Sequence, residues 1–255
     1  MKKLNYLLIT SGKFHYFEVA KILYERKHLL KIISGYPWFK LKKENIPKNF
    51  VECAGFFTIL NHILYRVPSL NLNYFINNFD FFKKKTIDLK ASKYLDDADI
   101  LIASSSTGLI SGKKIKNKNS IYCCDQSSAH ILFENDLVND EYNSLNYNRE
   151  FFTDERIKQN TLQEYEESDF ILVPSEYVKS TFKKNYHHKI FVNNFGINTK
   201  NFFPIENIIK DNKYFDIIYI GGISIRKGIH YLIDAFNNLN YSKKRLHLIG
   251  SHIEN

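Results

Sequence analysis

The sequence predicts an α/β protein built on a parallel, doubly wound sheet, and two observations lead to that fold class. Short apolar runs alternate with amphipathic stretches along most of the chain, and this alternation is typical of βαβ units. The apolar runs are nearly continuous, as expected of parallel strands that helices cover on both faces. The chain has 255 residues, 44% of them hydrophobic, which suffices for one large or two modest domains.

Turn residues end the apolar runs and so mark the elements of the first half. Ser11-Gly12-Lys13 follows the first run and Gly35-Tyr36-Pro37 follows the second, while Pro47 and Pro68 break a helix-rich, aromatic region. The resulting prediction is a strand at 4–10, a helix at 15–26, a strand at 29–34, helices within 40–95, and strands at 100–103 and 120–124.

The second half continues the same rhythm. Ser175 is predicted to cap a helix that carries Glu176 in its first turn, where a negative charge suits the helix dipole. The predicted elements are a polar helix at about 150–168, strands at 170–173 and 189–192, a polar linker at 201–213, a strand at 215–220, a helix at 229–236 and a strand at 246–249. We therefore expect one domain over 1–200 and a single βαβ unit over 214–255.

The turn after the strand at 215–220 has the composition of a phosphate site. Gly221 and Gly222 let backbone N–H groups approach an anion, and Arg226 and Lys227 are expected in the first turn of the following helix. The alternative is that both cations are solvated charges at a helix start, and the spacing alone does not decide between the two.

Charge and cysteine content limit the partners and the compartment. The formal net charge of +9 favours polyanionic partners, but no lysine run is dense enough for a nucleic-acid arm, so nucleic acid is not expected. Lys40, Lys42 and Lys43, and the cluster 83–85, lie beside aromatic residues and form either a membrane-facing patch or a solvated helix face. Three cysteines without a disulfide or zinc pattern favour a reducing cytoplasm.

Four motifs follow one another along the second half of the chain. They are Asp125-Gln-Ser-Ser-Ala-His130, then the segment 164–178 with its Glu164-Tyr-Glu-Glu-Ser-Asp and Pro174-Ser-Glu, then Asn194-Phe-Gly-Ile-Asn ahead of Phe203-Pro204, and finally Gly221-Gly222 with Arg226-Lys227-Gly228. Together, in this order and spacing, they resemble the retaining glycosyltransferases of family 4. The resemblance runs from about residue 100 to the end, and the turn at Ser11-Gly12 is consistent with it.

The resemblance implies a GT-B architecture of two Rossmann-like domains, with a saccharide or lipid-linked acceptor in the first and a nucleotide-sugar donor in the second. Such enzymes transfer the sugar with retention and need neither metal nor cofactor. Arg226 and Lys227 match the basic pair that holds the donor diphosphate, and Gly12, Gly221 and Gly222 would bring N–H groups to the phosphates. His130 would be the catalytic-site histidine that orients the sugar, and Asp125 would bind acceptor hydroxyls.

Each of these assignments has a structural alternative. His130 could be a structural histidine at a helix start, Asp125 could cap the turn after its strand, and Gly12 could form an ordinary β-to-α turn. Glu164, together with Glu166 and Glu167, is expected on a solvated helix face.

The chain departs from the family near its end, because a motif of two glutamates that binds the donor is absent. The second Rossmann-like domain is therefore expected to be incomplete, through a truncated gene, a fragment, or a short chain completed by a separately encoded C-terminal half. Two functions remain open: a glycosyltransferase of cell-surface polysaccharide assembly, cytoplasmic and peripheral at the inner face of the plasma membrane, or a non-catalytic acceptor-binding remnant.

Overall fold

The computed structural model describes the chain in segments that form two compact units. The first unit comprises Met1–Glu134 and Thr153–Gly196, and the second comprises Asn135–Phe152 and Ile197–Asn255. The described residues are 3–64, 73–116, 119–147, 153–200, 202–204 and 213–251. The linker predicted at 201–213 lies largely outside them, and the domain boundaries stay a prediction.

In the described part of the first unit, seven parallel strands form one sheet in the order β3-β2-β1-β4-β5-β6-β7. This arrangement confirms the predicted α/β, doubly wound class, because the chain leaves β1 first toward one edge and later toward the other. The strands are β1 Tyr6–Thr10, β2 Leu29–Ser34, β3 Val51–Cys53, β4 Ile100–Ser104, β5 Ile121–Asp125, β6 Phe170–Val173 and β7 Ile190–Val192.

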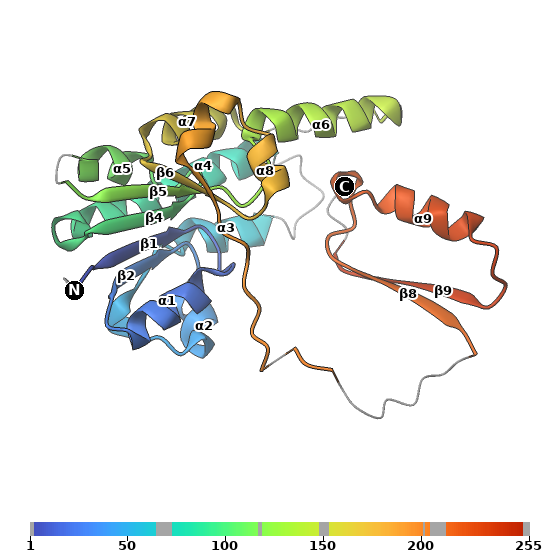
Figure 1. Cartoon of the computed structure of the whole chain (residues 1–255), viewed down its shortest axis with the longest axis horizontal. Helices are drawn as coiled ribbons and strands as arrows, with labels where there is room; N and C mark the ends of the chain where they lie inside the picture. Colours follow the sequence, from blue (N-terminus) through green and yellow to red (C-terminus); the bar gives the residue numbers. More distant parts are fainter. Residues whose placement is uncertain are drawn as a thin grey trace. The chain divides into compact units, whose positions relative to one another are not determined.

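Helices cover both faces of this sheet (Figure 1). The helices of the first half are α1 Tyr16–Glu25, α2 Trp38–Leu41, α3 Phe56–Leu64, α4 Asn73–Ala91 and α5 Leu109–Ile115, and those of the second half are α6 Ile131–Ser144, α7 Glu155–Glu167 and α8 Glu176–Ser180. Short 3₁₀ segments lie at Lys42–Glu44, Lys48–Phe50, Ser92–Asp97 and Lys184–Lys189. The edge strand β3 was not predicted, since three residues carry too little periodicity to be recognised.

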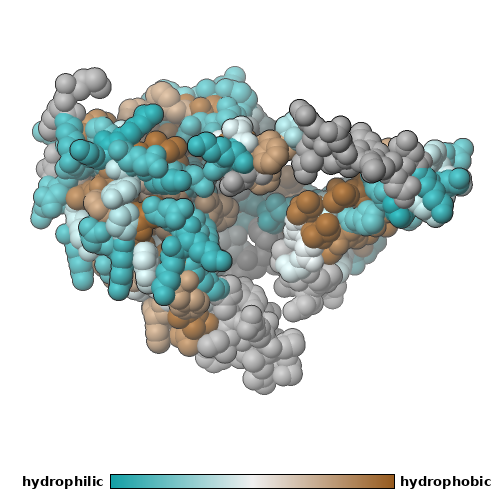
Figure 2. Space-filling view, turned by 90° about the horizontal axis from the view of Figure 1, so that it is seen from below, coloured by the Kyte–Doolittle hydropathy of each residue, from teal (hydrophilic) through white to brown (hydrophobic). Residues whose placement is uncertain are grey.

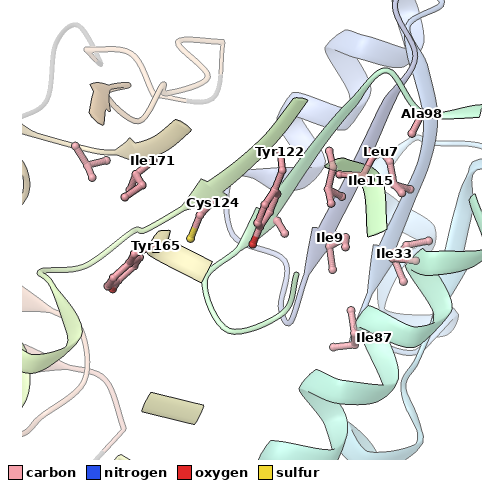
Figure 3. Packing of buried hydrophobic residues seen from close by; sticks show 14 of the residues in the cluster. Leu7, Ile9, Ile33, Ile87, Ala98, Ile115, Tyr122, Cys124, Tyr165 and Ile171 are labelled. Carbon is pink, nitrogen blue, oxygen red and sulfur yellow. The ribbon is translucent and has the colours of Figure 1, made fainter. Parts of the chain in front are cut away.

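The alternation of side chains along β1 divides the core into two layers. Leu8 points toward α1 and α2, where it is buried with Phe17 and Ile32. Leu7 and Ile9 point to the other face, toward α4, α5 and α7. Figure 3 shows this second layer, in which Leu7, Ile9 and Ile115 lie on one side of Tyr122 and Cys124 lies on the other.

Local capping explains where two elements begin and end. Ser175 Oγ accepts a hydrogen bond from the Val178 N–H at 3.2 Å, which confirms the predicted N-cap of α8. The Lys189 ammonium donates to the carbonyl oxygens of Tyr165, Glu166 and Ser168, at the C-terminal end of α7. A cation there satisfies carbonyls that have no partner within the helix.

The second unit contains a two-stranded parallel sheet with a connecting helix, together with the residues of α6 from Asn135 onward. Strand β8 spans Phe215–Ile220, a 3₁₀ turn spans Ile225–Lys227, α9 spans Ile229–Asn238 and β9 spans Lys244–Ile249. This is the predicted βαβ unit. Ile218 and Ile220 remain 60% and 77% exposed, so the expected cover on both faces of β8 is absent from the described residues. Figure 2 shows hydrophobic surface on this unit, at the right of the view.

Candidate functional site

A pocket of about 250 Å³ opens in the first unit at the carboxyl ends of β1, β4 and β5. These three strands are neighbours in the sheet, and the chain reverses its direction of winding between β1 and β4. Ligands of open α/β sheets bind at such a switch point, because the loops on either side of it diverge.

Hydroxyl groups dominate the lining of this pocket. Eight serine and threonine residues contribute: Ser11, Ser104, Ser105, Ser106, Ser127, Ser128, Thr153 and Thr161. Charged and amide side chains add Lys84, His15, Asp125, Gln126 and Glu134, while Phe14, Tyr16, Ile131 and Ile157 supply the apolar part. This set of donors and acceptors beside aromatic rings suits a ligand that itself carries many hydroxyl groups.

His15 and Asp125 form a hydrogen-bonded pair in the wall of the pocket. His15 Nε2 lies 3.0 Å from Asp125 Oδ2, and the Asp125 side chain is only 8% exposed. His15 precedes α1, and its ring also packs against that of Phe195, at a centroid distance of 4.7 Å and an angle of 33° between the ring planes. A carboxylate that holds one imidazole nitrogen fixes the ring, which can then exchange a proton with a ligand hydroxyl.

The structure places Asp125 in the pocket wall, paired with His15, while its predicted binding of acceptor hydroxyls stays a prediction. His15 was not singled out, because one histidine in a β-to-α turn has no distinctive spacing. The Tyr16 hydroxyl next to this pair is buried, and burial together with the Asp125 charge raises the pKa of Tyr16 well above its usual range.

His130 lies at the start of α6 and is not among the residues that line the pocket. Its ring packs against Tyr165 and Phe182 at centroid distances of 5.0 and 4.8 Å. Its Nδ1 accepts a hydrogen bond from the Leu132 N–H at 3.3 Å. Burial lowers the pKa of His130, and the nearby Lys183 charge lowers it further. These contacts are those expected of a structural histidine at a helix start. The role of His130 in orienting a sugar stays a prediction.

Gly12 forms the predicted turn after β1. Its N–H donates to Thr10 Oγ1 at 3.3 Å, and its carbonyl accepts from the same hydroxyl at 3.1 Å. Its role toward donor phosphates stays a prediction.

Arg226 and Lys227 were predicted in the first turn of α9. They lie instead in the separate 3₁₀ turn Ile225–Lys227. Gly228 divides the two elements with a left-handed φ of 67°, a conformation that a side chain disfavours. Arg226 and Lys227 are both exposed. Gly221 packs so closely against Gly250 that a Cβ on Gly250 would lie 1.7 Å from the Gly221 carbonyl oxygen.

Glu164 contradicts its prediction as a solvated side chain. It is fully buried on α7, and its carboxylate accepts hydrogen bonds from the Ser106 and Gly108 N–H groups at 2.5 and 2.7 Å. The helical pattern alone could not show this, since the three glutamates are close neighbours and only the tertiary fold decides which faces inward. Glu166 and Glu167 are more exposed.

The lysine cluster 83–85 is not entirely on the surface, because Lys84 is partly buried. Lys83 pairs with Asp80, and Lys84 donates to Ser106 Oγ at 2.5 Å within the pocket wall. Burial lowers the pKa of Lys84. The other cluster, Lys40 with Lys42 and Lys43, is exposed beside Phe39, which is 63% exposed.

Neither a metal site nor a membrane-spanning helix is found among the described residues. They contain no group of three His, Cys, Asp or Glu residues that could hold a metal ion. None of their helices combines the length and the apolar character needed to cross a membrane. All three cysteines are free thiols, and burial raises the pKa of Cys123 to about 12.

The fold and the pocket define a Rossmann-like α/β protein with a pocket at the switch point of its sheet. No protein-family model matches the chain, and no curated protein matches it. Among solved structures it is similar to the crystal structure of Arabidopsis thaliana UGT89C1 complexed with UDP-L-rhamnose. The identity is 10% and the TM-score 0.48, over 100% of this chain and 70% of that one. So distant a likeness says nothing of what this chain binds.

Proposed function

We propose that this chain is a glycosyltransferase that moves a sugar from a nucleotide-sugar to an acceptor hydroxyl. The observation that carries the proposal is the hydroxyl-lined pocket with its His15–Asp125 pair at the switch point of the sheet. A saccharide acceptor offers many hydroxyl groups to such a lining, and the pair can receive the proton of the hydroxyl that reacts. The four sequence motifs of family 4 add the reaction class.

In the proposed reaction, the acceptor oxygen approaches the anomeric carbon on the face from which the diphosphate departs. The new bond therefore forms with retention while the bond from that carbon to the diphosphate breaks. The acceptor proton passes to the His15–Asp125 pair, and the leaving nucleoside diphosphate carries away the electron pair. Arg226 and Lys227, with the N–H groups of Gly221 and Gly222, stabilise its developing charge. No metal or cofactor has a role in this proposal.

The motifs also support finer parts of the proposal. They favour transfer with retention, which proton NMR of the product would test through the anomeric coupling constant. They favour a role in cell-surface polysaccharide synthesis on a saccharide or lipid-linked acceptor. The exposed Lys40, Lys42 and Lys43 beside Phe39 suit contact with an anionic membrane at its cytoplasmic face.

The test is calorimetric titration of the whole chain with UDP and with GDP. We expect one of them to bind, and Lys227→Ala to weaken that binding roughly 10-fold to 100-fold, as the loss of a charge-assisted contact does. Lys243→Ala is the matched control, because Lys243 is an exposed lysine of the same unit outside the glycine turn. Equal binding by both variants would contradict the assignment of Lys227.

A second candidate is an acceptor-binding protein that performs no transfer alone and needs a separately encoded donor domain. The observation in its favour is that the pocket is lined entirely by residues of the first unit. A folded chain that binds saccharides but neither UDP nor GDP would support this candidate over the enzyme.

A further inference from the structure

Glu164 is a buried carboxylate whose partners are backbone amides of a distant loop. It lies on α7, and its two oxygens accept one hydrogen bond each from the Ser106 and Gly108 N–H groups. The Cys124 thiol makes a weaker contact with Oε2 at 3.9 Å. A carboxylate removed from water is tolerated when its oxygens are hydrogen-bonded, so these two amides are what makes the burial possible.

The loop held in this way has an unusual backbone. It connects β4 to α5, and Ser106 adopts a left-handed φ of 69°, which L side chains rarely adopt. The two bonds from Glu164 fall on either side of Thr107, whose hydroxyl donates to the Ser104 carbonyl at 2.6 Å. The carboxylate therefore holds the loop at its left-handed residue, Ser106, and again two positions later at Gly108.

The opposite side of the same loop faces the pocket. The Ser106 hydroxyl accepts a hydrogen bond from the Lys84 ammonium, and both side chains line the pocket. Asp88, one turn further along α4, accepts from the Ile110 and Ser111 N–H groups and so anchors the start of α5. A continuous set of contacts thus leads from Glu164 through Ser106 to a cation in the pocket wall.

We propose that Glu164 is a positioning residue of the pocket: by binding the Ser106 and Gly108 amides it keeps the Ser106 hydroxyl, and through it the Lys84 ammonium, on the pocket wall. The contacts described above support this positioning. Only its expected effect on acceptor binding rests on the proposed function. The sequence pattern predicts Glu164 on a solvated helix face, so this role is visible only in the tertiary structure.

The ionisation of Glu164 supplies a signature of this arrangement. Burial raises its pKa to about 8, against the lowering effect of the two amide bonds and of Lys84. The other titratable groups that interact with it include Asp88, Cys124, Tyr16, Tyr122 and Tyr165, and for each of them burial is the largest effect and raises the pKa. Ionised oxygens accept hydrogen bonds more strongly than neutral ones, so both amide protons should report the same titration.

The first test is amide NMR of the whole chain across the range from pH 6 to pH 9. We expect the Ser106 and Gly108 amide protons to move downfield together as the pH rises, with a shared midpoint near 8. Glu164→Gln preserves the size but presents an NH₂ group to one of the two N–H donors, so the titration should vanish and one peak should move upfield. The proposal would be overturned if the chemical shifts of these two amide protons changed neither with pH nor in Glu164→Gln.

The matched control is Glu167→Gln, because Glu167 lies on the same helix and pairs with Lys116 at 3.1 Å near the surface. It should leave both amide peaks in place. If Glu164→Gln does not fold, the wild-type titration and Glu164→Asp remain. The aspartate keeps the charge but is one methylene shorter, so it should weaken the shared shift.

The second test asks whether the effect reaches the pocket. The ε-carbon resonance of Lys84 should shift in Glu164→Gln and stay unchanged in Glu167→Gln, an effect that mere loss of stability would not produce in the folded state. In a transfer assay, Glu164→Gln should raise the acceptor KM several-fold while calorimetric binding of UDP or GDP stays as in wild type. An unchanged Lys84 resonance would contradict positioning, whereas absent nucleotide binding by wild type would count against the proposed function alone.

Discussion

His15 and Asp125 are 110 positions apart in the sequence, yet His15 Nε2 lies 3.0 Å from Asp125 Oδ2. The contact forms because β1 and β5 flank β4 in one parallel sheet, so the segments that follow them meet at the same edge. The pair is the feature of the pocket best suited to exchange a proton with a bound hydroxyl.

If the pair acts as a unit, its two members should not contribute independently. We expect His15→Ala and Asp125→Asn each to lower the rate of transfer by roughly 100-fold, and the double variant to be no slower than about the worse single one. The measurement is release of nucleoside diphosphate in the presence of acceptor. His188→Ala serves as control, since His188 is exposed and bonded only locally to the Asn185 carbonyl. Additive losses would show that the two residues act separately.

His130 allows its predicted orienting role to be separated from packing. We expect His130→Phe to retain transfer within about threefold, because an aromatic ring can keep the contacts with Tyr165 and Phe182. The free energy of unfolding should fall by about 1 kcal/mol, because phenylalanine cannot accept the hydrogen bond from the Leu132 N–H. Loss of transfer in a folded His130→Phe protein would instead support the orienting role.

The lowered pKa of His130 also has a consequence for stability. In the unfolded chain His130 binds a proton near pH 6.5, whereas in the folded chain its pKa is lower. Protonation therefore favours the unfolded state, and wild type should lose stability relative to His130→Phe as the pH falls below 6.5. Urea denaturation at pH 7 and pH 5.5 would measure the difference. A difference that does not depend on pH would contradict the burial of this ring.

Glu164 should make the protein less stable as the pH rises, whereas His130 should make it less stable as the pH falls. Its pKa is raised to about 8 in the folded chain and is near 4.3 when unfolded, so the folded state retains the proton longer. Stability present below about pH 4.3 is therefore lost as the pH rises toward 8, at roughly 1.4 kcal/mol for each unit of difference. We expect wild type to lose stability relative to Glu164→Gln between pH 5 and pH 8, measured by urea denaturation. Glu167→Gln should run parallel to wild type.

Gly228 should be sensitive to a side chain for reasons of backbone conformation alone. Gly228→Ala forces a left-handed φ of 67° on an L residue, although the nearest atom, of Tyr231, would lie at an unstrained 3.6 Å from the new Cβ. We expect a loss of about 1–2 kcal/mol in unfolding free energy. Gly196→Ala is the control, because nothing lies within 4 Å of a Cβ there. Equal stability of the two variants in thermal unfolding would contradict this account.

Much of the fold could be predicted from local pattern. Strands β2, β6 and β8 begin and end where the apolar runs do, and the Ser175 cap was recognisable from its residue type and place. These features depend on neighbours in the sequence, so a window of a few residues contains the physical information that they need.

The pocket depended on the tertiary structure. Asp125 could be proposed from its motif, but its partner His15 is joined to it only by the order of the strands. Glu164 was expected in water, since helical spacing does not show which side of α7 meets the loop of Ser106. The alternation of apolar runs by itself determined a parallel, doubly wound sheet, because burial of each strand is a local pattern. Which polar side chains meet at its edge was decided by tertiary contacts, because such contacts leave no periodic trace in the sequence.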